Sequence, residues 1–357
     1  MADQGPEGHD KPETGWPAAL PPGIPATAPS PGLTDTFSRV VRNLRISITD
    51  RCNLRCVYCM PEFPDWMAQE GILSYEEIHR LTSIFVRLGV EKIRITGGEP
   101  TVRRDLPTLV RLLSALPGLR RIGLTTNGIL LSELAPRLRE AGLQRINISL
   151  DSLDRERFRE MTRRDSLHQV LRGIDAAIEV KFSPIKLNCV VMRGVNEDEV
   201  VPFVEFGRAR GLEVRFIEFM PLDADDVWER RKVVSKAEIL AAVAAVHPFE
   251  VDSDEDPSAP ADRYRFLDGG GAFGVIGSVS EPFCSLCDRV RMTADGKLRT
   301  CLFALHETDL KTPLRDGASD EEIAQHIVHA VRRKQRGHAI DQAEFTKPER
   351  TMHRIGG

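Results

Sequence analysis

From about residue 43, short apolar runs alternate with segments that have the apolar periodicity of amphipathic helices. The runs are rich in Ile, Val, Leu and Phe and are short enough to be strands. We expect six strands, over 42–49, 92–96, 121–126, 146–150, 185–192 and 214–219. Strands that alternate with helices favour a parallel sheet. The pattern therefore predicts an α/β fold, either an incomplete barrel or an open, doubly wound sheet.

Three Ser-x-x-Glu sequences mark expected helix starts, at Ser74, Ser235 and Ser319. In such a capping box the serine and the glutamate each bind a backbone amide of the first turn. We expect these helices to end near Leu88, Val246 and Lys334. Further helices are expected over 105–116, 132–141 and 197–210, with helical patterns that end near Val180.

The alternating rhythm changes after Met220, which predicts a second unit of the chain. We expect a disordered tail over 1–36, because it holds eight prolines and five glycines with few large apolar residues. The expected barrel covers 37–235 and the expected C-terminal domain 236–340. Residues 341–357 read as a polar tail that ends in Gly-Gly and buries little surface.

The charge distribution excludes one class of function. The formal net charge is −4, and residues 1–36 alone hold five acidic residues and one lysine, so the remaining body is neutral. A nucleic-acid binder would carry a basic surplus, so none is expected as a partner. No apolar run is long enough to span a membrane, and the N-terminus lacks a secretory pattern. We therefore expect a cytoplasmic protein with reduced thiols.

Six of the seven cysteines form two triplets. Those triplets are Cys52, Cys56 and Cys59, and Cys284, Cys287 and Cys301. Cys189, in an expected strand, reads as a buried apolar residue. A cubane iron–sulfur cluster usually has four thiolate ligands, so three leave one iron open for chemistry. A structural zinc site remains the alternative for each triplet, with His306 as a candidate fourth ligand of the second.

Other polar sequences follow the first four expected strands. The first cysteine triplet follows the first strand, Gly97–Pro100 the second and Thr125–Gly128 the third, while Ser149 ends the fourth. Active sites of parallel α/β folds lie at this edge of the sheet. We therefore expect these segments to share one site.

Basic residues occupy positions within the apolar strands, at Arg45, Arg94, Lys186 and Arg215. Burying a cation is costly unless an acid or a bound anion pairs with it. Each of the four could form an ion pair with a neighbour in the sheet. Together they favour an anion site, because arginine matches phosphate oxygens in pairs.

The motifs together resemble a known family. The first cysteine loop, C-N-L-R-C-V-Y-C, and the later G-G-E-P are similar to those of the radical S-adenosylmethionine (SAM) superfamily. The segments K-I-R-I-T-G-G-E-P and R-F-I-E-F-M, the second triplet and the terminal Gly-Gly resemble the GTP 3′,8-cyclase family within it. The resemblance runs from about residue 38 to the end. Two departures are a short loop over 60–73 and the proline-rich extension.

The resemblance implies a fold, an activity and cofactors. It implies an incomplete (β/α)6 TIM-type barrel with a smaller C-terminal α+β domain that carries a second cluster and covers the barrel mouth. The implied reaction cyclises GTP to (8S)-3′,8-cyclo-7,8-dihydroguanosine 5′-triphosphate, the first step of molybdenum cofactor biosynthesis. The implied cofactors are S-adenosyl-L-methionine and two [4Fe-4S] clusters, one on each triplet.

The resemblance also implies site residues. SAM contacts carry over to Tyr58, Gly98, Ser149 and Met220. GTP contacts carry over to Arg45, Arg94, Thr125, Lys186, Arg215, Arg289, Val290 and Arg291. The terminal glycines, Gly356 and Gly357, are placed in the active site, where we expect a catalytic role.

Expected partners are an external electron donor, a downstream pterin-forming enzyme and a second copy in a homodimer. Two alternatives stay open at this point. One is a radical SAM peptide-modifying enzyme, against which the few cysteines in the C-terminal part argue. The other is a non-enzymatic, zinc-stabilised α/β binding protein, against which G-G-E-P after the second expected strand argues.

Overall fold

The computed structural model describes residues 32–253, 256–340, 342 and 345–356. Its main element is a twelve-stranded sheet with the strand order β14-β13-β12-β3-β4-β5-β6-β7-β8-β11-β10-β9. The six central strands run parallel in chain order. They are β3 (Asn43–Ser47), β4 (Lys92–Thr96), β5 (Arg121–Thr126), β6 (Arg145–Ser149), β7 (Ile185–Val191) and β8 (Glu213–Glu218). All six strands expected from the sequence are thus confirmed, and so is the α/β class.

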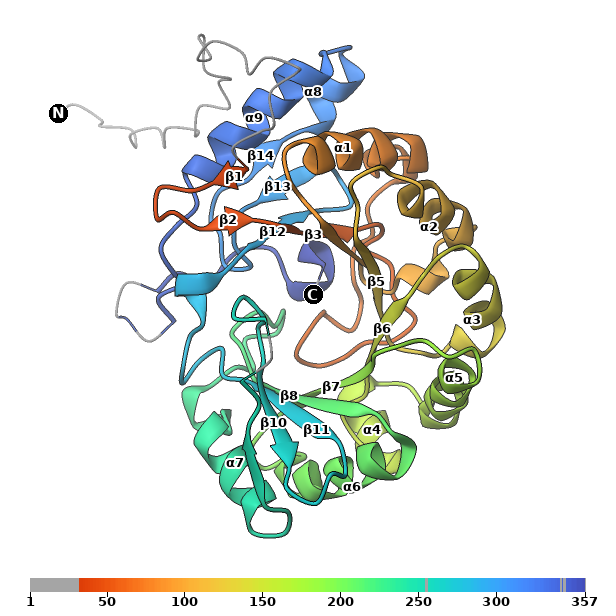
Figure 1. The fold of residues 1–357 in the computed structure, drawn as a ribbon, viewed down its shortest axis with the longest axis vertical. Coiled ribbons are helices and arrows are strands. Elements are labelled where there is room, and N and C mark those ends of the chain that lie inside the picture. Colours follow the sequence, from red (N-terminus) through yellow and green to blue (C-terminus); the bar gives the residue numbers. More distant parts are fainter. Residues whose placement is uncertain (1–31, 254–255, 341, 343–344, 357) are drawn as a thin grey trace, which may run out of the picture.

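Helices cross between these strands and cover the outer face of the curved sheet (Figure 1). They are α1 (Tyr75–Arg87), α2 (Leu106–Ser114), α3 (Leu131–Glu140), α4 (Arg155–Thr162), α5 (Leu167–Glu179) and α6 (Val200–Arg210). The expected capping boxes are present at Ser74 before α1, at Ser235 before α7 (Lys236–Ala244) and at Ser319 before α9 (Asp320–Arg332). Single 3₁₀ turns lie in the connections, at Gln69–Gly71, Pro100–Val102, Glu197–Glu199, Arg230–Lys232 and Cys284–Leu286.

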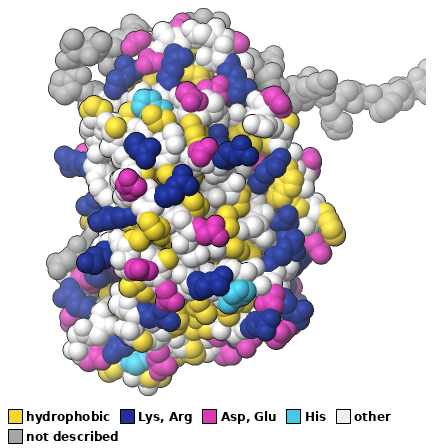
Figure 2. All heavy atoms as spheres, turned by 90° about the vertical axis from the view of Figure 1, so that its right-hand side faces the viewer, with side chains coloured by type: hydrophobic (Ala, Val, Ile, Leu, Met, Phe, Trp, Pro, Cys, Tyr) yellow, Lys and Arg dark blue, Asp and Glu magenta, His cyan; other side chains and the backbone are white. Residues whose placement is uncertain are grey.

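The side-chain alternation of the central strands separates two environments. In β3 and β4, Leu44, Ile46, Ile93 and Ile95 are buried in the main apolar core. Arg45 occupies the intervening position, opposite Arg94 on β4 and Arg291 on the neighbouring β12. Because successive strand residues point to opposite faces, these arginines project away from the helices. The outer surface of the helices instead mixes acidic and basic side chains (Figure 2).

The C-terminal part extends the same sheet at both edges. β11 (Ala272–Ile276) pairs in parallel with β8, and β12 (Arg289–Met292) pairs in parallel with β3. Antiparallel strands continue outward from each, with β10 (Asp262–Phe266) and β9 (Phe249–Val251) on one side and β13 (Lys297–Arg299) and β14 (Thr308–Asp309) on the other. The described strands of the expected C-terminal segment, β9 to β14, therefore all belong to this one sheet. Without this segment, β3 and β8 would be edge strands with unpaired backbone N–H and C=O groups, and β12 and β11 pair with those groups.

The expected disordered tail over 1–36 is wrong for its last residues. Positions 1–31 lie outside the described residues, but β1 (Leu33–Thr34) pairs with β2 (Val40–Val41). Asp35 lies in the turn between them, buried, and accepts a hydrogen bond of 2.6 Å from Nε of Arg39. Arg39 also donates to the backbone oxygen of Cys284 at 2.7 Å. The contact of Arg39 with Cys284, which is distant in the sequence, therefore helps to order residues 33–41, although the composition of residues 1–36 favours disorder.

The expectation that the C-terminal tail buries little surface is also wrong. A short helix, α10 (Met352–Ile355), brings the chain end to the middle of the molecule (Figure 1). Ile355 is fully buried in a small apolar cluster with Leu222, Val279, Phe303 and Ile340. The remaining helix, α8 (Lys311–Arg315), lies beside α9 at the periphery (Figure 1). No helix in the described part of the chain has the length and apolar character needed to cross a membrane.

The burial of Ile355 predicts a stability effect. Ile355→Ala should lower the free energy of unfolding by about 2–5 kcal/mol, because it leaves a cavity in a closed apolar cluster. Chemical denaturation of the purified protein measures this. Leu305→Ala is the control, since Leu305 is 54% exposed and its truncation should change stability by no more than about 0.5 kcal/mol. Equal effects of the two substitutions would mean that the tail does not contribute to the fold.

Candidate active site between two cysteine triplets

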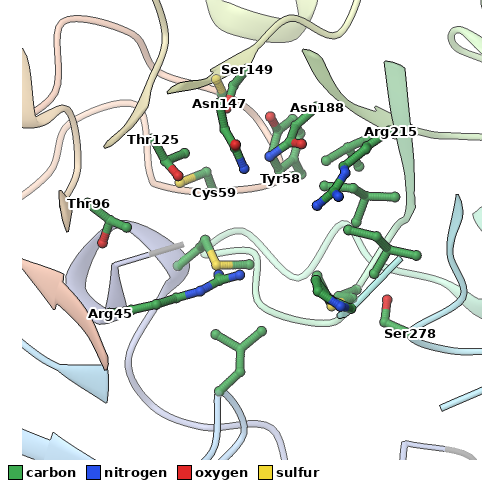
Figure 3. A pocket seen from close by; sticks show the side chains of 18 of the residues that line it. Arg45, Tyr58, Cys59, Thr96, Thr125, Asn147, Ser149, Asn188, Arg215 and Ser278 are labelled. Atoms are coloured by element: carbon green, nitrogen blue, oxygen red, sulfur yellow. The ribbon is translucent and has the colours of Figure 1, made fainter. Parts of the chain in front are cut away.

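A cavity of about 280 Å³ lies among the carboxyl ends of the central strands. Thr125, Ser149, Asn188 and Arg215 enter it from β5 to β8, facing Tyr58 and Cys59 from the first cysteine loop (Figure 3). Five cysteines line it, namely Cys52, Cys56, Cys59, Cys287 and Cys301. The sixth, Cys284, is not a lining residue, but it lies near enough to Cys287 and Cys301 to interact electrostatically with them. The cavity thus joins the two triplets.

The first triplet is held in a loop directly after β3. Backbone amides of Cys59 and Met60 donate to the Cys56 oxygen at 3.0 and 3.2 Å, which closes a tight turn. The amide of Val57 donates to the Met161 oxygen at 3.0 Å and fixes the loop to the end of α4. Burial raises the pKa of Cys52 to about 12 and raises the pKa values of Cys56 and Cys59. Such thiols ionise when a metal replaces the proton.

The second triplet has a more electropositive setting. Burial opposes ionisation of Cys287, but Arg289 and then Lys334 outweigh it and lower the pKa of Cys287 to about 7. Lys334 Nζ lies 3.5 Å from the Cys287 sulfur. His306, the candidate fourth ligand of a zinc site, is exposed and does not line the cavity.

The triplets fit clusters better than single ions. Within the described ranges, no three Cys, His, Asp or Glu side chains stand close enough together to hold one metal ion. A cubane takes one thiolate at each iron, so its ligands need not converge on one point. Both loops present thiols toward the shared cavity, where an open iron could meet a ligand. The residues present therefore suit a three-thiolate cluster at each end.

Three arginines carry positive charge deep between the triplets. Burial, and then the repulsion of neighbouring arginines, lower the pKa of Arg45 to about 10 and that of Arg94 to about 9. The pKa of Arg291 is lowered for the same reasons. Arg45 and Arg291 line the cavity, whereas Arg94 lies behind them and donates to the Leu124 oxygen at 3.3 Å. Cys287 and Asp288 partly offset the lowering of the pKa of Arg45. Among the described residues, no carboxylate lies within ion-pair distance of any of the three.

Lys186 and Arg215 are placed differently. Both form ion pairs with Glu213, at 2.8 and 2.7 Å. Although burial opposes ionisation of Glu213, Arg215 and Lys186 lower its pKa to about 2. Arg215 still lines the main cavity, but Lys186 lines a separate one at the amino ends of the strands. Glu213 directly precedes the expected sixth strand, but we did not predict from the sequence that it would pair with these two cations.

The expected SAM contacts come together. Tyr58, Gly98, Ser149 and Met220 all line the cavity near the first triplet. Gly98 passes so close to the Asp50 and Arg51 oxygens that a side chain there would collide with the backbone. This close approach is the physical reason for glycine in the G-G-E-P sequence. Thr125 and Arg289, two of the expected GTP contacts, also line the cavity.

The expected contacts Val290 and Gly356 are not lining residues of the cavity. The Val290 side chain is fully buried in the main apolar core. Gly356 has its backbone oxygen 2.5 Å from Nη1 of Arg291, so the tail reaches the arginine group. Gly357 lies outside the described residues.

Sequence reasoning missed two acids that organise the site. Tyr58 Oη donates to Asp151 Oδ2 at 2.6 Å, and burial raises the pKa of Asp151 to about 6. Glu99 accepts hydrogen bonds from Thr101, Thr126 and the Asn127 amide, at 2.5–2.9 Å, and ties together the segments after β4 and β5. Asp151 follows Ser149 at a strand end, so its position was a usable signal.

Comparisons with known proteins cover nearly the whole chain. Residues 46–207 match the radical SAM superfamily, and residues 212–340 match the family Molybdenum Cofactor Synthesis C. A GTP 3′,8-cyclase from Rhodopirellula baltica is 46% identical over 94% of this chain and 95% of its own. One from Streptomyces coelicolor is 46% identical over 91% and 96%, and a mitochondrial one from Arabidopsis thaliana is 45% identical over 91% and 83%.

Among solved structures, Streptococcus suis SuiB bound to its precursor peptide SuiA has a TM-score of 0.59 over 88% of this chain and 76% of its own. SuiB bound to S-adenosylmethionine has a TM-score of 0.56 over 80% and 68%. At 14% and 15% identity, these two similarities concern the fold alone. The extent and identity of the sequence matches decide the assignment: the chain belongs to the GTP 3′,8-cyclase family of radical SAM enzymes.

Proposed function

We propose that this chain cyclises GTP to (8S)-3′,8-cyclo-7,8-dihydroguanosine 5′-triphosphate, the first step of molybdenum cofactor biosynthesis. Its relatives of 45–46% identity carry the name of this activity. The observation that carries the proposal is the group Arg45, Arg94 and Arg291, which lies between two cysteine triplets and forms no close ion pair with a carboxylate of the described chain. Such a group requires an anion, and a triphosphate supplies one.

The cofactors are S-adenosyl-L-methionine and [4Fe-4S] clusters. Cys52, Cys56 and Cys59 would hold the first cluster, and Cys284, Cys287 and Cys301 the second. When bound, the cofactors supply one-electron reduction and hydrogen-atom abstraction, chemistry that protein side chains lack. The first-cluster loop, Tyr58, Gly98, Ser149 and Met220 would bind and orient SAM. Asp151 would hold the Tyr58 ring in place through its 2.6 Å hydrogen bond.

The arginine group would bind the triphosphate and fix the ribose between the two ends of the cavity. Arg45, Arg94, Arg289 and Arg291 offer guanidinium groups, and Thr125 a hydroxyl. Lys186 and Arg215 would take part by sharing their charge between Glu213 and a phosphate. Val290 would contribute through its backbone, since its side chain is in the core. Orientation matters here because a reacting carbon has to lie within reach of carbon 8 of the base.

The tail would close the cavity and exclude water. Gly356 is held by Arg291, and Ile355 closes an apolar cluster beside it. A site that handles radicals benefits from such exclusion, because water permits side reactions. The catalytic role proposed for Gly356 and Gly357 rests on the contact of Gly356 with Arg291.

The architecture has a finer interpretation. We propose that β3 to β8 form the incomplete (β/α)6 barrel, within residues 37–235. Residues 236–340 would extend it at both edges and carry the second cluster. An external electron donor, a downstream pterin-forming enzyme and a homodimer partner complete the proposal.

The cluster assignment predicts metal contents. Anaerobically reconstituted protein should hold about eight irons per chain, the content of two cubanes. Replacing Cys52, Cys56 and Cys59 together by alanine should halve this value and abolish SAM cleavage. Cys284→Ala should lose cyclised product while SAM cleavage persists. Cys189→Ala is the control, because Cys189 is buried outside both triplets and should leave iron content unchanged. One zinc per chain and no iron would contradict the assignment.

The arginine group predicts opposite effects on binding and stability. Arg45→Met should weaken GTP binding by roughly tenfold to a hundredfold, the loss of a charge-assisted contact of about 1.5–3 kcal/mol. The same substitution should raise the melting temperature of the ligand-free protein, since it removes a half-buried cation that other arginines repel and that no carboxylate of the described chain pairs at close range. Calorimetric titration and thermal unfolding measure the two effects. Arg172→Met, at an exposed position on α5, should change neither. If Arg45→Met lowers the melting temperature and leaves GTP affinity unchanged, Arg45 stabilises the fold and does not bind the substrate.

The tail geometry predicts a specific effect of one methyl group. Gly356 has φ +84°, and a Cβ there would lie 2.6 Å from Thr96 Oγ1 and 2.8 Å from Ser47 Cβ. Gly356→Ala should therefore displace the chain end and sharply reduce cyclised product, while SAM cleavage continues. Gly317→Ala is the matched control, because Gly317 has φ +86° and nothing within 4 Å. An alanine at position 317 therefore has a similarly unfavourable positive φ, but its Cβ meets no neighbouring atom. Parental product formation by Gly356→Ala would show that the chain end has no catalytic role.

A further inference from the structure

Lys334 is a buried cation beside the second triplet that the proposed reaction does not use. It follows the end of α9 and is 3% exposed, whereas its neighbours Arg332, Arg333 and Arg336 are exposed. One side chain of a basic run therefore turns inward.

Both acceptors of the Lys334 ammonium belong to the segment Cys287–Arg289. Nζ donates to the Arg289 backbone oxygen at 2.5 Å and lies 3.5 Å from the Cys287 sulfur. Among the residues described, no carboxylate forms an ion pair with it, and the cation Arg39 repels it. Lys334 thus bridges Cys287, which lies just before β12, and Arg289, the first residue of β12.

A buried ammonium is costly when only neutral groups surround it. The Cys287 sulfur is the group here that can supply negative charge, as a thiolate bound to iron. In the first triplet, the cation Arg55 donates to the Cys52 backbone oxygen at 2.6 Å, and in the described chain no cationic donor contacts the Cys52 sulfur itself. The Cys52 sulfur accepts from neutral donors, the Leu54 amide at 3.4 Å and Asn127 Nδ2 at 3.8 Å.

We propose that Lys334 is a positioning residue of the second cluster, which acts through Cys287 and makes that cluster easier to reduce. Hydrogen bonds to the ligating sulfurs and nearby charge are among the factors that set cluster potentials. A cationic donor stabilises the reduced form, because reduction adds an electron to an already anionic cluster. The inference rests on the proposed function, because it requires a cluster on the second triplet.

The test uses full-length protein with Cys52, Cys56 and Cys59 replaced by alanine, so that the second cluster alone is observed. Iron content and the midpoint potential, followed by electron paramagnetic resonance, are measured. Lys334→Met removes the charge and keeps an unbranched chain. We expect it to shift the reduced-to-oxidised ratio at the parental midpoint about tenfold toward the oxidised form, or about 59 mV for one electron. Lys334→Arg should shift it less.

Arg333→Met is the matched control, since it removes an exposed charge one residue away. An unchanged potential in Lys334→Met, or an equal shift in Arg333→Met, would overturn the role of Lys334. If Lys334→Met holds no iron, Lys334→Arg decides: retained iron supports the proposal, and equal loss refutes it. If the parental background itself binds no cluster, the second cluster of the proposed function fails, and this inference with it.

Discussion

Positive charge enclosed by a parallel sheet is the constraint on which the rest of this structure depends. Arg45, Arg94 and Arg291 face one another across β3, β4 and β12, and burial with mutual repulsion lowers the pKa of each. Such an arrangement is unfavourable in a protein without its ligand, so the surrounding apolar core has to offset it. The electrostatic repulsion is concentrated where an anionic substrate would bind and neutralise it. Local destabilisation of this kind is common at functional sites.

The two triplets are far apart in the chain, and the C-terminal tail connects them in space. His353 Nδ1 lies 3.5 Å from the Cys59 backbone oxygen, and its ring packs edge-on against Trp66 at 6.1 Å. Three residues later, the Gly356 oxygen meets Arg291, near the second triplet. The four residues 353–356 thus contact the loop of one predicted cluster and the arginine that neighbours the other. The sequence of the tail is polar enough that composition alone gives no sign of this.

Local signals in the sequence predicted local structure well. All six central strands and the capping boxes at Ser74, Ser235 and Ser319 follow from periodicity and from contacts within a few residues. Cysteine spacing likewise located both halves of the site. The failures concern partners that are distant in sequence. The pairing of β12 with β3, the anchoring of Arg39 to the Cys284 backbone, the burial of Ile355 and the inward turn of Lys334 depend on segments far apart in the sequence or on the assembled interior, which no local pattern encodes.

The pairing of β3 with β12 has a consequence for synthesis. Residues 43–47 leave the ribosome long before residues 289–292, so one edge of the growing sheet stays uncovered for most of translation. Cys59 precedes Cys284 by 225 residues (284 minus 59), which corresponds to roughly 11 to 45 seconds at typical elongation rates of about 5–20 residues per second. During that interval the loop that follows β3, with Cys52, Cys56 and Cys59, lies beside a sheet edge that β12 has not yet covered. The order of the chain thus separates the synthesis of the first cysteine loop from its enclosure.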